Sequence, residues 1–157
     1  MNIMARIKID IPETFSFRTE IPVRITDINY GGHLGNDKLL SVFHEARMQF
    51  LKHFGQSEKD FFGCGLIMSD AAIQYKSEAF YGDTLTIYIS PGDFSNSGFD
   101  LVSLIINKKT ENEVARVKTG MVCYDYQNKT LTKLPEKAKR SVFLYTMRPS
   151  VPWPTKG

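Results

Sequence analysis

The segment from Asp27 to Asn36 gathers side chains that can do chemistry onto glycine-rich backbone. It supplies a carboxylate, an amide and an imidazole through Asp27, Asn29 and His33. A carboxylate or a histidine can act as a general base or as a nucleophile. Unpaired N–H groups at the start of a helix can stabilise the oxyanion of a carbonyl group under attack. The segment therefore predicts a site that polarises a carbonyl group, provided that a helix follows it.

Residues 37–54 predict that helix, and it is the clearest element in the sequence. Its apolar side chains recur at helical spacing: Leu39, Phe43, Ala46 and Phe50. We expect Asn36 to be the N-cap of the helix. Gly32, Gly35 and Asn36 then become the substrate-binding positions, with the Asn36 backbone N–H as the donor to the carbonyl oxygen. Because the apolar stripe is wide, other structure should enclose most of the helix.

The remaining elements predict strands, so the fold class is α+β. Apolar and polar alternation between turn residues delimits five strands, at residues 15–26, 66–76, 84–89, 99–107 and 113–126. We expect a five-stranded antiparallel sheet wrapped around one long central helix. The tail, residues 135–157, should hold a short helix and then run extended over the surface, because it is rich in proline. Residues 1–157 are expected to form a single domain with its core at about 15–130.

Composition excludes several classes of protein. The net charge is only +3, from 20 basic and 17 acidic residues, so we expect no nucleic-acid partner. No run of about 20 apolar residues predicts a membrane helix, and the N-terminus lacks the apolar stretch of a signal peptide. Cys64 and Cys123 match no metal or redox spacing, so we expect buried, reduced thiols, no metal and a cytoplasmic location. A lone helix covers only part of a sheet, which favours a homodimer or a homotetramer built as a dimer of dimers.

The order of these motifs resembles a known family. The matching residues are Asp27, Gly32, His33, Leu34 and Asn36 in the loop, Glu45-Ala46-Arg47 in the helix, and Tyr81-Gly82-Asp83 at a later turn. Together they resemble the hot-dog-fold acyl-CoA thioesterases of the 4-hydroxybenzoyl-CoA thioesterase type, whose loop runs D-x-D-x-x-G-H-V-N-N. The resemblance covers roughly residues 15–130. It implies the hot-dog fold, hydrolysis of acyl-CoA to a free acid and CoA, and no cofactor beyond the CoA of the substrate.

Two positions depart from the family pattern. Asn29 stands where the family has a catalytic aspartate, and a neutral amide cannot act as a carboxylate nucleophile or base. Gly31 replaces an asparagine that is functional in plant acyl-ACP thioesterases. A third arrangement in the family pairs a loop amide with a helix carboxylate, usually across a dimer interface. Asn29 and Glu45 resemble that pair, 16 residues apart. The catalytic candidates are therefore Asp27, Asn29, His33 and Glu45.

Each candidate also has a structural explanation. Asp27 could cap the loop, Asn29 could support a turn, and His33 could brace the loop by donating to a carbonyl. Glu45 could be a surface carboxylate, and Arg47 a paired structural arginine rather than a CoA contact. For the whole protein, the alternatives to acyl-CoA hydrolysis are a non-catalytic acyl-CoA binding module and an acyl-ACP thioesterase. A hydroxyacyl dehydratase fits less well, because no Pro-rich motif follows His33.

Overall fold

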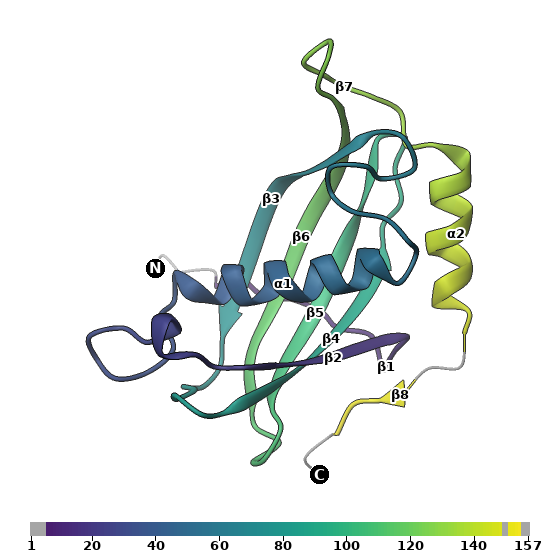
Figure 1. Cartoon of the computed structure of the whole chain (residues 1–157). Coiled ribbons are helices and arrows are strands. Elements are labelled where there is room, and N and C mark those ends of the chain that lie inside the picture. Colours follow the sequence, from purple (N-terminus) through teal and green to yellow (C-terminus); the bar gives the residue numbers. More distant parts are fainter. Residues whose placement is uncertain (1–5, 149–150, 155–157) are drawn as a thin grey trace, which may run out of the picture.

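The structure is a computed structural model that describes residues 6–148 and 151–154. Its helices are α1 (Lys38–Lys52), α2 (Glu136–Thr146) and the short 3-10 helix η1 (Ile25–Asp27). Its strands are β1 (Thr14–Phe15), β2 (Phe17–Pro22), β3 (Gly65–Tyr75), β4 (Thr84–Gly92), β5 (Gly98–Asn107), β6 (Glu113–Asp125), β7 (Thr130–Leu131) and β8 (Val151–Pro152). The sheet curls around α1, and α2 lies at one flank (Figure 1).

The main sheet is antiparallel and has the strand order β2-β4-β5-β6-β3. The short strand β7 pairs with β6 outside that path. β2 and β3 are therefore the two edges of the five-strand path. The predicted α+β architecture, a five-stranded antiparallel sheet around one long helix, is confirmed.

The inner face of the sheet and α1 bury the main core. Its fully buried side chains from α1 and the facing strands include Leu39, Phe43, Phe50, Leu51, Leu85, Ile87, Ile89, Leu101 and Ile105. Burial of each such side chain contributes roughly 1.5–3 kcal/mol relative to exposure. α1 is thus enclosed, as its wide apolar stripe predicts. The loop that precedes α1 therefore ends at a firmly held element.

The helix α2 closes one end of this core. The Tyr145 ring packs edge-on against the rings of Phe50 and Phe54, with centroid distances of 5.9 and 5.0 Å. The Tyr145 hydroxyl donates to the Ser16 carbonyl at 2.9 Å. The predicted short helix in the tail is therefore present, and it contributes to the core.

Described residues from the N-terminal and C-terminal regions cover part of the outer face of the sheet. A second buried cluster lies there, formed by Phe15, Tyr88, Leu104 and Ile106, with Ile11 and Trp153 packed against it. Arg116 donates to the Ile9 carbonyl at 3.1 Å, and the Ile9 N–H donates to the Gln74 side chain at 3.3 Å. Strand β8 pairs with β1, and Trp153 Nε1 donates to the Pro12 carbonyl at 3.2 Å. The described part of the tail, residues 151–154, is therefore extended as predicted, and in addition Val151–Pro152 pairs as a strand.

The prediction of one strand over residues 15–26 is wrong. These residues belong to β1, β2 and η1 and to the short connections between them. The strand is interrupted between β1 and β2 at Ser16, whose carbonyl accepts the hydrogen bond from the Tyr145 hydroxyl of α2. The chain turns again into η1 because the Asp27 carboxylate accepts a hydrogen bond from the Arg24 N–H at 2.9 Å. Both breaks depend on contacts that hydrophobic alternation does not report.

Two further boundaries differ from the predictions. The N-cap of α1 is Asp37, so the prediction of Asn36 is wrong by one residue. A turn in which the Lys38 N–H donates to the Gly35 carbonyl, at 3.0 Å, precedes the helix and delays its start. Pro91 lies inside β4 instead of ending it. The pairing of β2 with β4 ends at Ile89, two residues before Pro91. The missing N–H of Pro91 therefore removes no hydrogen bond between these two strands.

Candidate active site

Residues 27–36 form a closed loop between η1 and α1, which projects from one side of the molecule (Figure 1). The Asn29 N–H donates to the His33 carbonyl at 2.9 Å, and the Gly35 N–H donates to the Asp27 carbonyl at 3.0 Å. The Leu34 N–H donates at 2.7 Å to a carbonyl in the connection between β3 and β4. Backbone hydrogen bonds therefore hold this loop in one shape beside the start of α1.

Asn29 and His33 support the loop from within. Asn29 Oδ1 accepts from the Gly31 N–H at 2.9 Å and from the His33 N–H at 3.4 Å, so this oxygen is engaged. His33 Nδ1 lies 3.3 Å from the Leu34 carbonyl, which can only accept. Nδ1 therefore carries the proton, and Nε2 carries the lone pair. Nε2 lies 3.7 Å from Glu78 Oε1, too far for a good hydrogen bond.

Asp27 is turned away from solvent and is only 2% exposed. Its Oδ2 accepts from the Arg24 backbone N–H at 2.9 Å, and the Arg24 guanidinium lies 3.3 Å from each carboxylate oxygen. The carboxylate thus caps η1, which is the structural role considered for it in the sequence.

A cleft of about 440 Å³ opens between this loop and the end of β3. It is lined by Asn29, His33, Leu34, Asn36, Tyr75, Lys76, Ser77 and Glu78. The Tyr75 hydroxyl donates to the Asn36 carbonyl at 2.8 Å. Burial, followed by the nearby Asp37 carboxylate, raises the pKa of Tyr75, so this hydroxyl stays protonated as a donor. Among the described residues none accepts from the Asn36 N–H, which leaves this donor for a ligand.

Two of the predicted glycines shape the approach to Asn36. A Cβ added at Gly35 would lie 2.6 Å from Asp37 Oδ1, so a side chain there would require the Asp37 carboxylate to move. Gly32 has a φ of 84°, in the left-handed region that glycine favours. Gly32 therefore shapes the loop through its backbone, whereas at Gly35 the space for a side chain is limited by Asp37. We call the cleft beside them the loop cleft.

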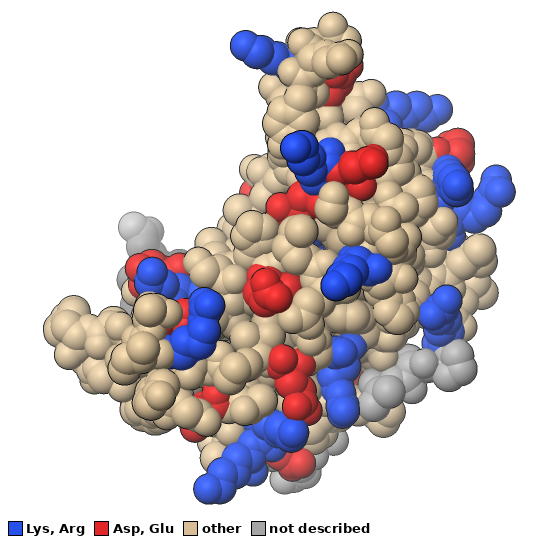
Figure 2. All heavy atoms as spheres, viewed as in Figure 1, with Lys and Arg blue, Asp and Glu red and all other residues tan. Residues whose placement is uncertain are grey.

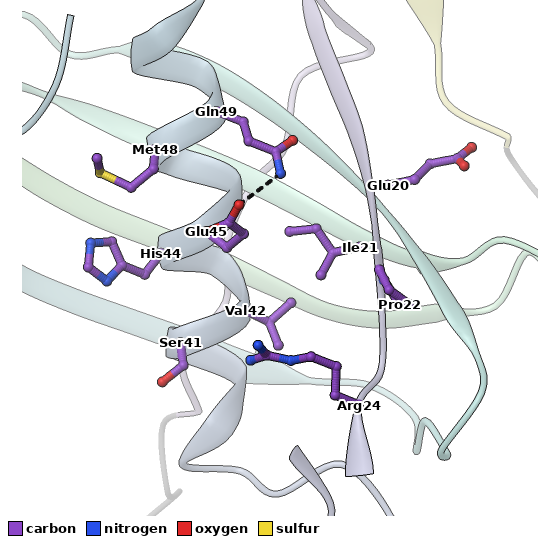
Figure 3. A pocket seen from close by; sticks show the side chains of 10 residues that line it. All are labelled: Glu20, Ile21, Pro22, Arg24, Ser41, Val42, His44, Glu45, Met48 and Gln49. Atoms are coloured by element: carbon purple, nitrogen blue, oxygen red, sulfur yellow. Dashed lines mark hydrogen bonds between the residues drawn. The ribbon is translucent and has the colours of Figure 1, made fainter. Parts of the chain in front are cut away.

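Glu45 lines a different cleft, of about 380 Å³, between α1 and β2 (Figure 3). In Figure 3, Glu45 and Gln49 extend toward β2, whereas His44 and Met48 lie along the opposite flank of the helix. The Gln49 side-chain amide donates to Glu45 at 3.1 Å. No residue lines both this cleft and the loop cleft. Within one chain, the structure therefore does not bring Glu45 together with Asn29.

A larger cleft, of about 1000 Å³, lies beside the first half of β3, and His44 and Met48 line both this cleft and the Glu45 cleft. We call it the large cleft, and its lining is His44, Arg47, Met48, Ser57, Glu58, Lys59, Leu66, Ile67, Met68 and Tyr126. Glu58 Oε1 accepts from Arg47 Nε at 2.7 Å, and Glu58 Oε2 lies 3.0 Å from His44 Nε2. Arg47 is 6% exposed, which confirms the paired structural arginine.

His44 and Glu58 are not among the candidates predicted from the sequence. His44 and Arg47 are three residues apart, so their shared helix face was the one available signal. Glu58 follows the helix in an irregular segment, where no periodicity indicates which way a side chain points. Only the folded chain shows that its carboxylate joins the two helix residues.

The profile of the thioesterase-like superfamily matches residues 23–142, which include the loop, α1 and every strand from β3 to β7. The chain belongs to this superfamily. The family expected from the loop and helix motifs is thereby confirmed.

Individual relatives agree with this membership. A 1,4-dihydroxy-2-naphthoyl-CoA hydrolase from Microcystis aeruginosa is 32% identical over 120 residues, which cover 74% of this chain and 86% of that protein. The structure of a 1,4-dihydroxy-2-naphthoyl-CoA thioesterase from Synechocystis matches with a TM-score of 0.75 at 22% identity, covering 87% of this chain and 99% of that one. A hypothetical protein from Staphylococcus aureus in complex with CoA matches with a TM-score of 0.76 at 17% identity, covering 94% and 93%. These likenesses confirm the hot-dog fold.

The described residues also bear on three expectations from composition. None of their helices has the length and apolar content to cross a bilayer. On the face shown in Figure 2, basic and acidic side chains are interspersed. Cys123 is a buried free thiol, as expected, whereas Cys64 is free but partly exposed.

Proposed function

We propose that this chain hydrolyses acyl-CoA thioesters to a free acid and CoA. The observation that carries the proposal is the Asn36 N–H, which has no acceptor among the described residues and belongs to a residue that lines the same cleft as His33. This cleft lies within the region that matches the superfamily. An aromatic acyl group is the first candidate, because the Microcystis relative is named a 1,4-dihydroxy-2-naphthoyl-CoA hydrolase.

The proposed mechanism begins with the thioester carbonyl at the Asn36 N–H. As water adds to the carbonyl carbon, negative charge grows on the oxygen, and this N–H together with the positive end of α1 stabilises it. The C–S bond then breaks, and CoA leaves as a thiol after taking up a proton. Asn29 cannot accept the proton of the water, because its amide is not basic. Water is the only co-reactant that this chemistry needs.

The test is thiol release by the purified protein from a panel of short, long and aromatic acyl-CoAs, with an acyl-ACP as a further donor. We expect release from at least one acyl-CoA and a lower kcat/KM for His33→Ala. His53→Ala is the matched control, because His53 lies at the far end of α1 and lines neither the loop cleft nor the large cleft. Release from no acyl-CoA would refute the proposal. A thermal shift on binding without turnover would then support the binding module instead.

We propose further that the active unit is a homodimer paired through β3. This strand is an edge of the sheet, and its central residues 68–71 are exposed. Figure 2 shows the molecule hollowed on this flank, between the projecting loop and the hairpin of β6 and β7. No described strand pairs with the outer side of β3, whose register with β6 is irregular between Met68 and Asp70. An edge of this kind is a template for another strand, and a second copy offers an identical one.

Pairing of two β3 strands would complete the site. The loop cleft lies at the Tyr75 end of β3, and the large cleft lies at the Leu66 end. In an antiparallel pair about the middle of the strand, the Tyr75 end of one copy meets the Leu66 end of the other. Each loop cleft would thus adjoin the large cleft of the second copy.

Light scattering on a gel-filtration column tests the dimer. We expect a mass of twice 17.9 kDa for the wild type. Ala71→Glu should lower the mass toward one chain, because the two-fold axis would bring two new carboxylates close together. Thr130→Glu, on the exposed strand β7, places the same charge away from β3 and should leave the mass unchanged. A wild-type monomer that is fully active would refute the pairing.

A further inference from the structure

The polar cluster in the large cleft has the arrangement of an oriented catalytic base. We propose that His44, positioned by Glu58 and anchored through Arg47, is the general base of thioester hydrolysis. The inference rests on the proposed acyl-CoA hydrolysis and on the proposed pairing through β3. It supplies the proton acceptor that Asn29 cannot provide.

Glu58 is held in place both at its carboxylate and at its backbone. Oε1 accepts from Arg47 Nε at 2.7 Å, and Arg47 is almost fully buried, with its guanidinium 5.8 Å from the centre of the Phe43 ring. The Glu58 backbone is fixed as well, because its carbonyl accepts from the Leu66 N–H at 2.8 Å. A carboxylate held in this way can hold an imidazole in one orientation.

The contact with Glu58 determines which ring nitrogen of neutral His44 carries the proton. Glu58 Oε2 lies 3.0 Å from His44 Nε2, and an ionised carboxylate can only accept. Nε2 therefore carries the proton in the neutral ring, and Nδ1 carries the lone pair. The His44 side chain is 51% exposed, and no described residue hydrogen-bonds to Nδ1. The basic nitrogen is thus free to accept a proton from water in the cleft.

His33 does not meet the same requirement. Its Nε2 lies 3.7 Å from Glu78, a largely exposed side chain that is paired with no arginine of the described residues. His33 lies on the loop that presents the carbonyl donor, so it contacts the substrate from that side. His44 belongs to the large cleft, which the β3 pairing would place against the loop cleft of the second copy.

The reaction balances without a further reactant. His44 Nδ1 takes one proton from water while the water oxygen forms a bond to the thioester carbon. The tetrahedral intermediate collapses, the C–S bond breaks, and the electron pair of that bond leaves on the CoA sulfur. The imidazolium returns its proton to the sulfur, which regenerates neutral His44 and releases the acid and CoA. Glu58 stabilises the imidazolium but does not itself change protonation.

The experiment measures kcat and KM for His44→Ala and Glu58→Gln on the acyl-CoA that the wild type hydrolyses best. We expect His44→Ala to lower kcat by about 10²–10⁴-fold with little change in KM, which is the usual contribution of a general base. Free imidazole in the buffer should restore part of that loss, because it replaces the missing base. Glu58→Gln should lower kcat less and leave KM similar.

Two controls separate this role from a structural one. Glu113→Gln removes another carboxylate that is paired with an arginine, at 2.9 Å and with similar exposure, so it should leave kcat unchanged. His53→Ala removes a histidine at the C-terminal end of the same helix, outside both clefts. His44→Ala with wild-type kcat, or with a loss that imidazole does not restore, overturns the inference. Since both results presuppose an active wild type, the proposed hydrolysis would stand in either case.

Discussion

Substitutions of Asp27 test whether its carboxylate has a structural or a catalytic role. In Asp27→Ala the protein loses the hydrogen bond from the Arg24 N–H, 2.9 Å long, and the two guanidinium contacts at 3.3 Å. Removal of a capping side chain costs about 0.5–2 kcal/mol, and a bond to a charged acceptor is worth about 1.5–3 kcal/mol. The Arg24 side chain is 67% exposed, so its ion pair adds little.

The expected loss is therefore about 2 kcal/mol in the free energy of unfolding. For a chain of this size it corresponds to a fall in Tm of about 4–8 °C, measured by differential scanning calorimetry. Asp27→Asn keeps an acceptor for the Arg24 N–H, so it should recover part of the Tm and, at a temperature well below unfolding, most of the wild-type kcat. Asp27→Asn that is as stable as the wild type but as inactive as Asp27→Ala would refute this reasoning and assign the carboxylate a catalytic role.

Three other predictions concern contacts away from the clefts. Tyr145→Phe removes the hydroxyl that donates to Ser16 and should lower the free energy of unfolding in urea by about 1 kcal/mol; an unchanged midpoint would contradict this. Burial, and then the hydrogen bond with Cys64, raises the pKa of the Cys123 thiol, so a thiol reagent at neutral pH should modify at most Cys64 until the protein unfolds. Trp153 is the single tryptophan, and its fluorescence should change at lower denaturant than the far-ultraviolet circular dichroism, because β1 and β8 pair through only two residues each.

The sequence predicts those parts of the fold that depend on local pattern. The apolar stripe of α1 is strong because it buries one defined face, and the core-facing positions of β4 and β5 recur at every second residue. Tyr88, Leu104 and Ile106 are buried on the outer face as well, which the alternation does not predict. The start of α1 is misplaced by one residue, since a turn at Gly35 and Lys38 precedes it. The pairing of β1 with β8 joins opposite ends of the chain, and two residues in each strand leave no periodic pattern.

The candidate site follows the same division. The loop and its glycines could be located from residue types, because a carboxylate, an amide and a histidine occur together within a short segment. Their contacts could not be: Asn29 and Asp27 direct their oxygens toward backbone and arginine donors rather than into the loop cleft. The cluster of His44, Arg47 and Glu58 depends on a loop folding back against a helix, which residue spacing does not encode.

The β2 edge of the sheet, opposite β3, determines whether paired chains can add further strands. β2 carries exposed Arg18 and Glu20 and ends at Pro22, which has no N–H to offer a neighbouring strand. Charged residues and proline on an edge oppose the addition of another strand. If two chains join through β3, the combined sheet ends on both sides in a β2 strand that resists extension. Association would then stop at the pair, and replacing these three residues with β-branched apolar ones should allow growth into fibres.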